Sequence, residues 1–219
     1  MRKPLIQVRL THGMLGALLI TACACSGTKW TEVEKDSFRI VTQKGGATLG
    51  YSPNSGVSLL TVDGYAFKDL NKDGKLDPYE DWRLPAKERA TDLAAQLSIE
   101  EIAGLMLYSA HQAIPGVSTG FGAATYNGKT LEESGAQPYD LSDAQKKFLV
   151  EDNLRHVLVT KVQSPEVAAR WNNNVQALVE GIGHGIPANN SSDPRHGTAA
   201  NAEYNYGSGG QREIWPPLP

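Results

Sequence analysis

Cysteine is scarce in this chain and confined to one end of it. The 219 residues contain two cysteines, Cys23 and Cys25, and both lie close to the N-terminus. The sequence that follows them has no cysteine from which to build a disulfide framework. We therefore expect the bulk of the chain to be stabilised by packing and by a bound metal.

An excess of charge of one sign and a long hydrophobic run are also lacking. The chain has 21 Lys and Arg against 24 Asp and Glu, a net charge of -3, which gives no electrostatic reason to expect a nucleic-acid partner. Its clearest apolar run, Met14–Ala22, is too short to cross a bilayer as a helix. With 40% hydrophobic residues, the composition is that of a globular protein with room for one sizeable domain.

The first 22 residues have the features of a bacterial export signal. A cationic start (Arg2, Lys3 and Arg9) precedes the apolar run, the order typical of a signal peptide. The following Ile20-Thr21-Ala22-Cys23 resembles a lipobox, in which the cysteine receives lipid. This predicts a signal peptide over residues 1–22, lipidation of Cys23, and a lipid-anchored protein in the bacterial periplasm or at the outer membrane. In the alternative, both cysteines belong to a signal cut by another peptidase.

Residues 23–64 are interpreted as a linker and an N-terminal extension. Two β-branched or apolar runs, Phe38–Thr42 and Val57–Val62, are separated by turn-forming residues that include Gly45 and Gly46, which predicts two short strands. No function is expected from this part of the chain.

The segment Asp69–Glu80 matches every position of the EF-hand calcium-loop pattern. Calcium prefers six to eight oxygen ligands, and Gly74 permits the sharp bend that such a loop requires. The expected metal ligands are Asp69, Asn71, Asp73, Asp77 and Glu80, with the carbonyl oxygen of Lys75. Because Pro85 shortens any following helix, we expect residues 65–84 to form an EF-hand-like structural clip rather than a sensor. The alternative is an acidic turn without a metal.

Helical patterns dominate the sequence after Pro85. Apolar spacing predicts a helix over 86–96 with one buried face and a second from Ile99 to about Ala110, in which the core residues are Ile102, Leu105, Met106 and Tyr108. Ser98 and Glu101 form a capping box for this second helix. Residues 115–138 are rich in Gly, Ser, Thr and Asn, which predicts a long surface loop. The same capping logic starts another helix near Ser142.

Strand and helix patterns then alternate. Val157–Thr160 is typical of a buried parallel strand, Ser164 and Pro165 begin a helix with an apolar stripe, and the next strand begins at Ile186. This order predicts an α/β fold in which residues 85–219 form the first, incomplete part of a (β/α)8 TIM-like barrel. Ligands of such barrels bind at the carboxyl ends of the strands.

The segment from Gly185 to Gly197 (GIPANNSSDPRHG) resembles the signature of glycoside hydrolase family 3. The resemblance extends from Asp77 to Gly210. It implies that Asp193 binds hydroxyl groups of the sugar, and that Arg195 and His196 lie beside it in the substrate site. Asp193 follows the Ile186 strand, where a barrel binds its ligand. Without the resemblance, Asp193 would be interpreted as a turn or capping residue.

The resemblance also implies the reaction. Family 3 enzymes of the β-glucosidase type hydrolyse β-linked glucosides or oligosaccharides with retention, using a carboxylate nucleophile and a separate acid/base carboxylate. In the family both carboxylates follow the signature by a long distance, so no catalytic residue is assigned here, and we expect residues 1–219 to be an inactive N-terminal fragment. The alternative function is a non-catalytic, exported calcium-binding module.

Overall fold

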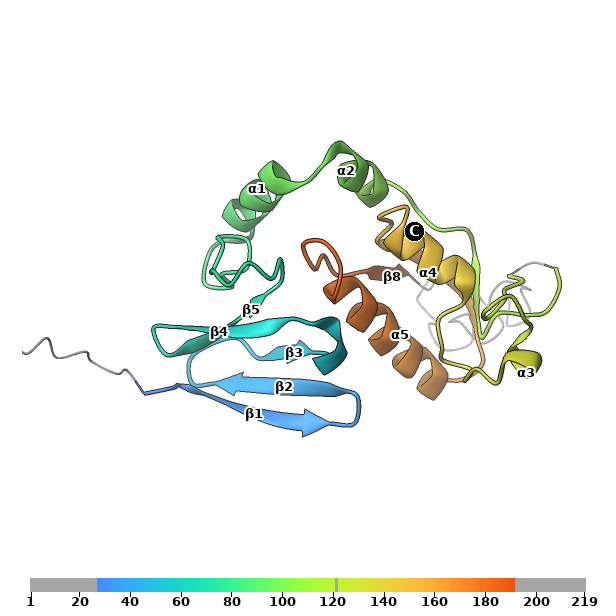
Figure 1. Cartoon of the computed structure of the whole chain (residues 1–219), viewed down its shortest axis with the longest axis horizontal. Coiled ribbons are helices and arrows are strands. Elements are labelled where there is room, and N and C mark those ends of the chain that lie inside the picture. The colour runs from blue at the N-terminus through green and yellow to red at the C-terminus, as the bar shows by residue number, and fades with distance from the viewer. Residues whose placement is uncertain (1–26, 121, 192–219) are drawn as a thin grey trace, which may run out of the picture.

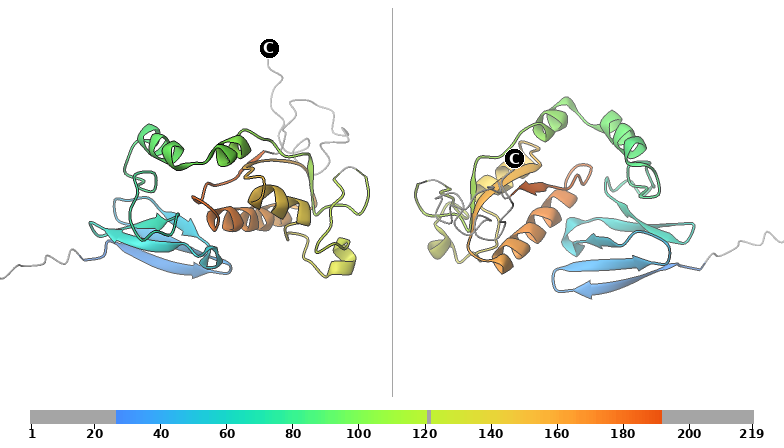
Figure 2. Two further views of the ribbon diagram at one scale, coloured as in Figure 1. Left: turned by 45° about the horizontal axis from the view of Figure 1, so that its top comes forward. Right: turned by 180° about the vertical axis from the view of Figure 1, so that it is seen from behind.

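The computed structural model describes residues 27–120 and 122–191. These residues form an N-terminal β part, two connecting helices and a C-terminal α/β part (Figure 1). The order of elements along the chain is β1 to β5, α1, α2, β6, α3, α4, β7, α5 and β8, with the 3-10 helix η1 (Pro53–Ser55) between β3 and β4. Figure 2 shows that α1 and α2 lie along one side of the molecule and reach from the β part to the α/β part.

The N-terminal part consists of two small antiparallel sheets. The first contains β1 (Trp30–Lys35), β2 (Phe38–Gln43) and β3 (Leu49–Tyr51), and the second is the hairpin of β4 (Ser58–Val62) and β5 (Tyr65–Asp69). Val41 and Ala66 are completely buried and form a small core with Tyr51. The two strands predicted from sequence are confirmed as β2 and β4, whereas β1, β3 and β5 were not predicted.

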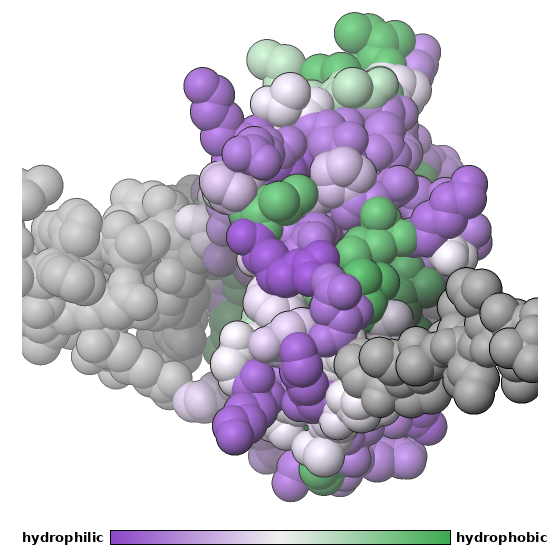
Figure 3. Space-filling model, turned by 90° about the vertical axis from the view of Figure 1, so that its left-hand side faces the viewer, coloured by the Kyte–Doolittle hydropathy of each residue, from purple (hydrophilic) through white to green (hydrophobic). Residues whose placement is uncertain are grey.

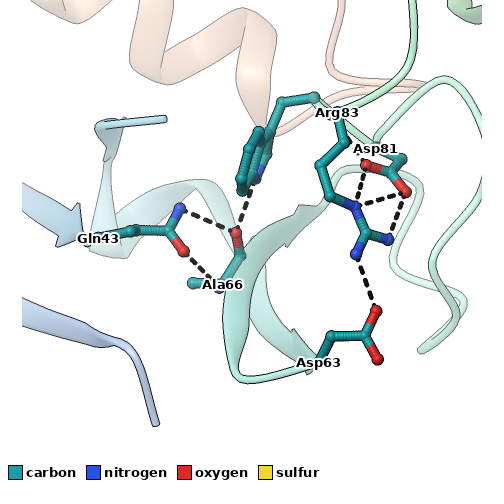
Figure 4. Close-up of polar contacts among 6 residues, drawn as sticks. Gln43, Asp63, Ala66, Asp81 and Arg83 are labelled. Atoms are coloured by element: carbon teal, nitrogen blue, oxygen red, sulfur yellow. Dashed lines mark hydrogen bonds and ion pairs between the residues drawn. The ribbon is translucent and has the colours of Figure 1, made fainter. Parts of the chain in front are cut away.

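Polar side chains join the two sheets and fix the chain that leaves them (Figure 4). The Gln43 side chain donates to the Ala66 carbonyl (3.1 Å) and accepts from the Ala66 amide (2.7 Å). Trp82 donates its indole N–H to the same carbonyl (3.0 Å), and Arg83 pairs with Asp81 (2.6 Å) and Asp63 (2.9 Å). The Arg83 guanidinium lowers the pKa of the Asp81 carboxyl. Residues 81–83 therefore tie the chain back to the sheets directly after the predicted calcium loop.

Two helices connect the β part to the α/β part. α1 (Ala86–Gln96) lies where sequence predicts it. α2 (Ile99–Leu105) begins at the predicted residue with the Ser98–Glu101 capping box, but it ends at Leu105 and not near Ala110 as predicted. The predicted burial is wrong, because α1 has no buried residue, and Met106 and Tyr108 are 83% and 50% exposed. Periodicity identified an apolar face on each helix, but Leu93, Leu97, Ile102 and Leu105 are only half-buried. Hydrophobic residues accordingly stand at the top of the mostly hydrophilic side in Figure 3, at the level of α1 and α2.

The C-terminal part is a parallel sheet covered by helices. β6 (Gln112–Ile114), β7 (His156–Val162) and β8 (Asn189–Ser191) pair in that order, all parallel. α4 (Asp143–Val150) and α5 (Pro165–Glu180) begin at the predicted Ser142 and Ser164 caps. The predicted loop over 115–138 contains a short helix that was not predicted, α3 (Leu131–Ser134), which has its own capping box at Thr130 and Glu133.

The stripe of α5 packs on the sheet as its spacing predicts. Trp171, Val175 and Val179 are buried against Leu149 and Val157. The predicted strand–helix–strand order is confirmed, although the last strand begins at Asn189 and not at Ile186 as predicted. The fold is therefore mixed α/β, but residues 27–120 and 122–191 do not close a barrel. Within these ranges no helix combines the length and apolarity needed to cross a membrane.

Candidate functional site

The predicted calcium loop begins at the last residue of β5 and bends back on itself. The left-handed backbone at Lys72 (φ 63°) and Gly74 (φ 78°) turns the chain, and side chains hold the turns. Asn71 Oδ1 accepts from the Asp73 amide (3.1 Å), and Asp73 Oδ1 accepts from the Lys75 amide (2.8 Å). Local Asx turns of this kind explain why Asn and Asp occupy these positions.

Glu80 closes the loop from its far end. Its carboxylate accepts from the backbone amides of Leu70 (2.6 Å), Asn71 (3.3 Å) and Asp77 (3.1 Å). These bonds favour the charged carboxylate, but burial outweighs them and raises the pKa of Glu80. The structure thus brings the first and last predicted ligands, Asp69 and Glu80, to the base of one compact loop.

The first ligand position contains an unsatisfied acceptor. Asp69 is only 4% exposed. Its Oδ2 atom accepts from Ser58 Oγ (3.1 Å) and the Gly74 amide (3.2 Å), whereas its Oδ1 atom is buried without a hydrogen-bond partner. The hydroxyl of Tyr79 is also buried without a partner, and burial together with the nearby carboxylates of Glu80, Asp77 and Asp69 raises the Tyr79 pKa. A buried polar atom that lacks a partner is costly and calls for an explanation.

The donor chemistry of the loop fits a hard cation, but the carboxylates do not converge. The predicted ligands supply only oxygen, the element that Ca²⁺ prefers. Among the residues that the structure describes, however, no group of three or more His, Cys, Asp or Glu side chains is placed to hold a metal ion. Asp77 illustrates the difference, because its carboxylate accepts from the side-chain amide of Asn71 (2.7 Å). The EF-hand interpretation therefore stays a prediction.

The carboxyl ends of β6, β7 and β8 form the edge at which the second site is predicted. These strands are parallel, so their carboxyl ends share one edge of the sheet. Ligands of β/α barrels and of open α/β sheets bind at this edge. β8 pairs with the first half of β7, where Asn189 lies opposite His156 and Ser191 lies opposite Leu158. Asp193, Arg195 and His196 lie outside the described residues, as does Cys23.

Asn190 is a polar residue of this region that sequence reasoning did not single out. Its side-chain amide donates to Asn172 Oδ1 of α5 (2.6 Å), and its own Oδ1 is buried without a partner. A polar side chain within a strand pattern was the available signal, but the contact with α5 depends on the tertiary fold.

A cavity of about 880 Å³ lies between the β part and α5, away from the strand ends. Its walls include Tyr51 and Lys68 on one side, and Asn174 and Ala177 of α5 on the other. Ligands of β/α folds bind outside the carboxyl ends of the strands and not beside the covering helices. The cavity is therefore not assigned as the substrate site.

Comparison with known proteins relates the chain to a glycosidase. No protein-family profile matches it. Over 142 residues it is 41% identical to a protein from Dickeya chrysanthemi named periplasmic beta-glucosidase/beta-xylosidase, and the match covers 64% of this chain and 19% of that protein. The matched region thus spans about a fifth of the relative's length. The chain is accordingly a homologue, over this stretch, of a periplasmic beta-glucosidase/beta-xylosidase, in agreement with the predicted resemblance to glycoside hydrolase family 3.

Proposed function

We propose that this chain is the N-terminal part of an exported family 3 glycoside hydrolase that cleaves O-glycosyl bonds of β-glucosides. The observation that carries the proposal is the 41% identity with the beta-glucosidase/beta-xylosidase of Dickeya chrysanthemi. The parallel β6–β7–β8 sheet with α5 packed on it is compatible with the start of a (β/α)8 barrel. In that fold the sugar would bind at the carboxyl ends of the strands.

Asp193 is proposed to bind sugar hydroxyl groups beside Arg195 and His196. Hydrogen bonds from sugar hydroxyls to a carboxylate strengthen as the oxocarbenium-like transition state develops, so they contribute to kcat and not only to binding. The nucleophile and the acid/base carboxylate are assigned to no residue of this chain. For this reason we propose that residues 1–219 alone do not hydrolyse the substrate.

The test is hydrolysis of an aryl β-glucoside and an aryl β-xyloside. One sample is the 219-residue chain, and the other is the same chain extended by the part of the Dickeya protein that follows the matched region. We expect turnover only in the extended protein, and a loss of at least about tenfold in kcat/KM in its Asp193→Ala variant. The Glu132→Ala variant, which removes an exposed carboxylate of α3, is the matched control. Undiminished kcat/KM in Asp193→Ala would remove this residue from the sugar site.

We further propose that Cys23 carries lipid and holds the protein on a periplasmic membrane surface. The support is the lipobox-like Ile20-Thr21-Ala22 and the similarity to a Dickeya chrysanthemi protein that is named as periplasmic. A diacylglyceryl group with a second acyl chain gives lasting anchorage. Cys23→Ser should move the protein from the membrane to the soluble fraction, whereas Cys25→Ser should not. A wild-type protein that is already soluble would contradict the proposal.

A non-catalytic calcium-binding module is the alternative function. The observation that favours it is the buried, unpartnered Oδ1 atom of Asp69. If the extended protein lacks turnover while the 219-residue chain folds cooperatively with calcium, this alternative replaces the hydrolase proposal.

A further inference from the structure

We propose that residues 69–80 bind one Ca²⁺ ion and that this ion fastens the β4–β5 hairpin to the C-terminal end of α5. The proposal concerns stability and coupling within the chain and is independent of glycoside hydrolysis. It rests on two sets of observations: the oxygen atoms that the loop offers, and the contacts that the loop makes with the turn after α5.

The need for a cation is clearest at Asp69. This carboxylate is almost completely buried and one of its oxygen atoms has no partner. An ionised carboxylate in that position loses its hydration, and the cost is offset only by hydrogen bonds, an opposite charge or a metal. Asp69 is also the first position of the loop pattern, where a calcium ligand is required.

Further oxygen ligands lie within the same loop, but only the exposed ones can move without breaking buried hydrogen bonds. Asp73 is exposed, and its Oδ1 atom accepts only a local bond from the Lys75 amide. Glu80 at the twelfth position holds three backbone amides. Turning Glu80 toward Asp69 would release these amides, so binding requires a local rearrangement of the loop.

The loop touches the end of α5 at three places. Lys72 Nζ donates to the Gly181 carbonyl (2.5 Å), at the C-cap of α5. Leu70 packs so closely on Gly185 that a Cβ atom there would lie 2.8 Å from Leu70 Cδ2. Each of these loop residues adjoins one or two predicted ligands in sequence.

The third contact comes from the other end of the loop. The Tyr79 ring meets the His184 ring edge-on at 6.0 Å, and His184 Nδ1 lies 3.4 Å from Glu101 of α2. Residues 181–185 therefore contact both ends of the loop and also α2. A cation that fixes the loop will fix this turn as well, because Leu70, Lys72 and Tyr79 are direct sequence neighbours of the predicted ligands.

Calorimetric titration of the metal-free 219-residue chain with CaCl2 tests the binding half. We expect a dissociation constant at or below about 1 mM, the range of extracellular calcium modules. Glu80→Gln and Asp73→Asn should each weaken binding at least about tenfold, and Glu88→Gln, which removes an exposed carboxylate of α1, should leave it unchanged. Absence of binding at about 10 mM Ca²⁺, or equal affinity in wild type and Glu80→Gln, overturns the proposal.

Amide hydrogen exchange with and without Ca²⁺ tests the coupling half. In the wild type, we expect calcium to slow exchange in residues 70–80 and also in residues 180–185. In Lys72→Met, calcium should protect the loop while the effect on residues 180–185 falls at least about twofold. Protection confined to the loop in the wild type would show that the ion does not fasten the two segments, and would overturn the coupling.

Discussion

Arg155 is a charged residue that the molecule places in its interior. It is 6% exposed, and its guanidinium donates to the carbonyls of Leu149 (2.7 Å), Leu154 (2.9 Å) and Ile186 (3.1 Å). It thereby joins the end of α4, the start of β7 and the segment before β8. Burial lowers the pKa of the guanidinium, but arginine keeps its charge in proteins.

Replacing Arg155 by lysine should lower the free energy of unfolding by about 2 kcal/mol. Lysine retains the charge but cannot reach three carbonyls with a rigid planar group, so buried acceptors lose their donors. Urea unfolding of the 219-residue chain measures the effect. Arg170→Lys is the control, because Arg170 pairs with Glu166 on the surface and should change stability by less than about 0.5 kcal/mol. Equal midpoints for both variants would contradict the assigned role.

Asp143 couples the long loop to α4 in a pH-dependent way. Its carboxylate accepts from Thr125 Oγ1 and from the amides of Asn127 and Gly128, each at 2.8 Å. These bonds, above all that from Gly128, lower the pKa of Asp143. A lowered pKa in the folded state stabilises the protein above the unfolded pKa of about 3.9, and the contribution is lost as pH falls through the folded pKa.

Asp143→Asn should therefore be less stable than wild type at about pH 6, and the difference should shrink by about pH 3. The measurement is the urea midpoint of both proteins across this pH range. Parallel pH profiles would mean that the carboxylate contributes nothing through its charge.

At the scale of the element, sequence predicted what is local. The caps at Ser98 and Ser142 are patterns within four residues, and both are confirmed. The burial of Met106 was predicted wrongly, because whether a face is covered depends on distant parts of the chain. The calcium loop shows the same difference between local and tertiary features. Its twelve-residue pattern can be recognised in the sequence. The hydrogen bonds from backbone amides to Glu80 and the missing partner of Asp69 Oδ1 are visible only in the three-dimensional structure.

Gln145 caps α4, as the local sequence pattern predicts, and it also connects α4 to α5 and β6. Its Oε1 atom accepts from the Ser142 amide (3.1 Å) and from Trp171 of α5 (3.0 Å), and its Nε2 atom donates to Gln112 of β6 (3.2 Å). The residue is 1% exposed. A buried polar network of this kind favours one packing arrangement only when every donor and acceptor in it has a hydrogen-bond partner.

Gln145→Leu should lower the free energy of unfolding by about 2 to 3 kcal/mol, because it leaves the Trp171 indole N–H and the Ser142 amide buried without acceptors. Glu133→Leu removes the equivalent residue of the exposed α3 box and should cost about 1 kcal/mol or less. Thermal and urea unfolding measure both. If Gln145→Leu lowers the free energy of unfolding no more than Glu133→Leu does, Gln145 contributes only as a helix cap and not through the buried network.

At the scale of the molecule, the residues that the structure describes form two hydrophobic cores, which are joined by residues far apart in sequence. One core centres on Val41 and Ala66, and the other on Trp171 and Val175. Glu180, at the end of α5, accepts from Lys68 Nζ (2.6 Å) and from the Ser52 amide (2.9 Å). These partners are 112 and 128 residues away, so no local pattern predicts the junction, and sequence analysis assigned residues 23–64 no role.

The Lys68–Glu180 pair should stabilise this junction measurably. Glu180 is 8% exposed, and removing one partner of a largely buried pair leaves an uncompensated charge. The side chain of Lys68 is 26% exposed, so water reduces the loss, and we expect Glu180→Gln to cost about 2 kcal/mol. In a double-mutant cycle with Lys68→Met, the coupling energy should exceed about 1 kcal/mol. The exposed Glu166–Arg170 pair, treated in the same way, should give about 0.5 kcal/mol or less. If the two cycles give equal coupling, the ion pair does not hold the β part on α5, and the Ser52–Glu180 hydrogen bond together with the contacts between the 69–80 loop and residues 181–185 must hold the junction.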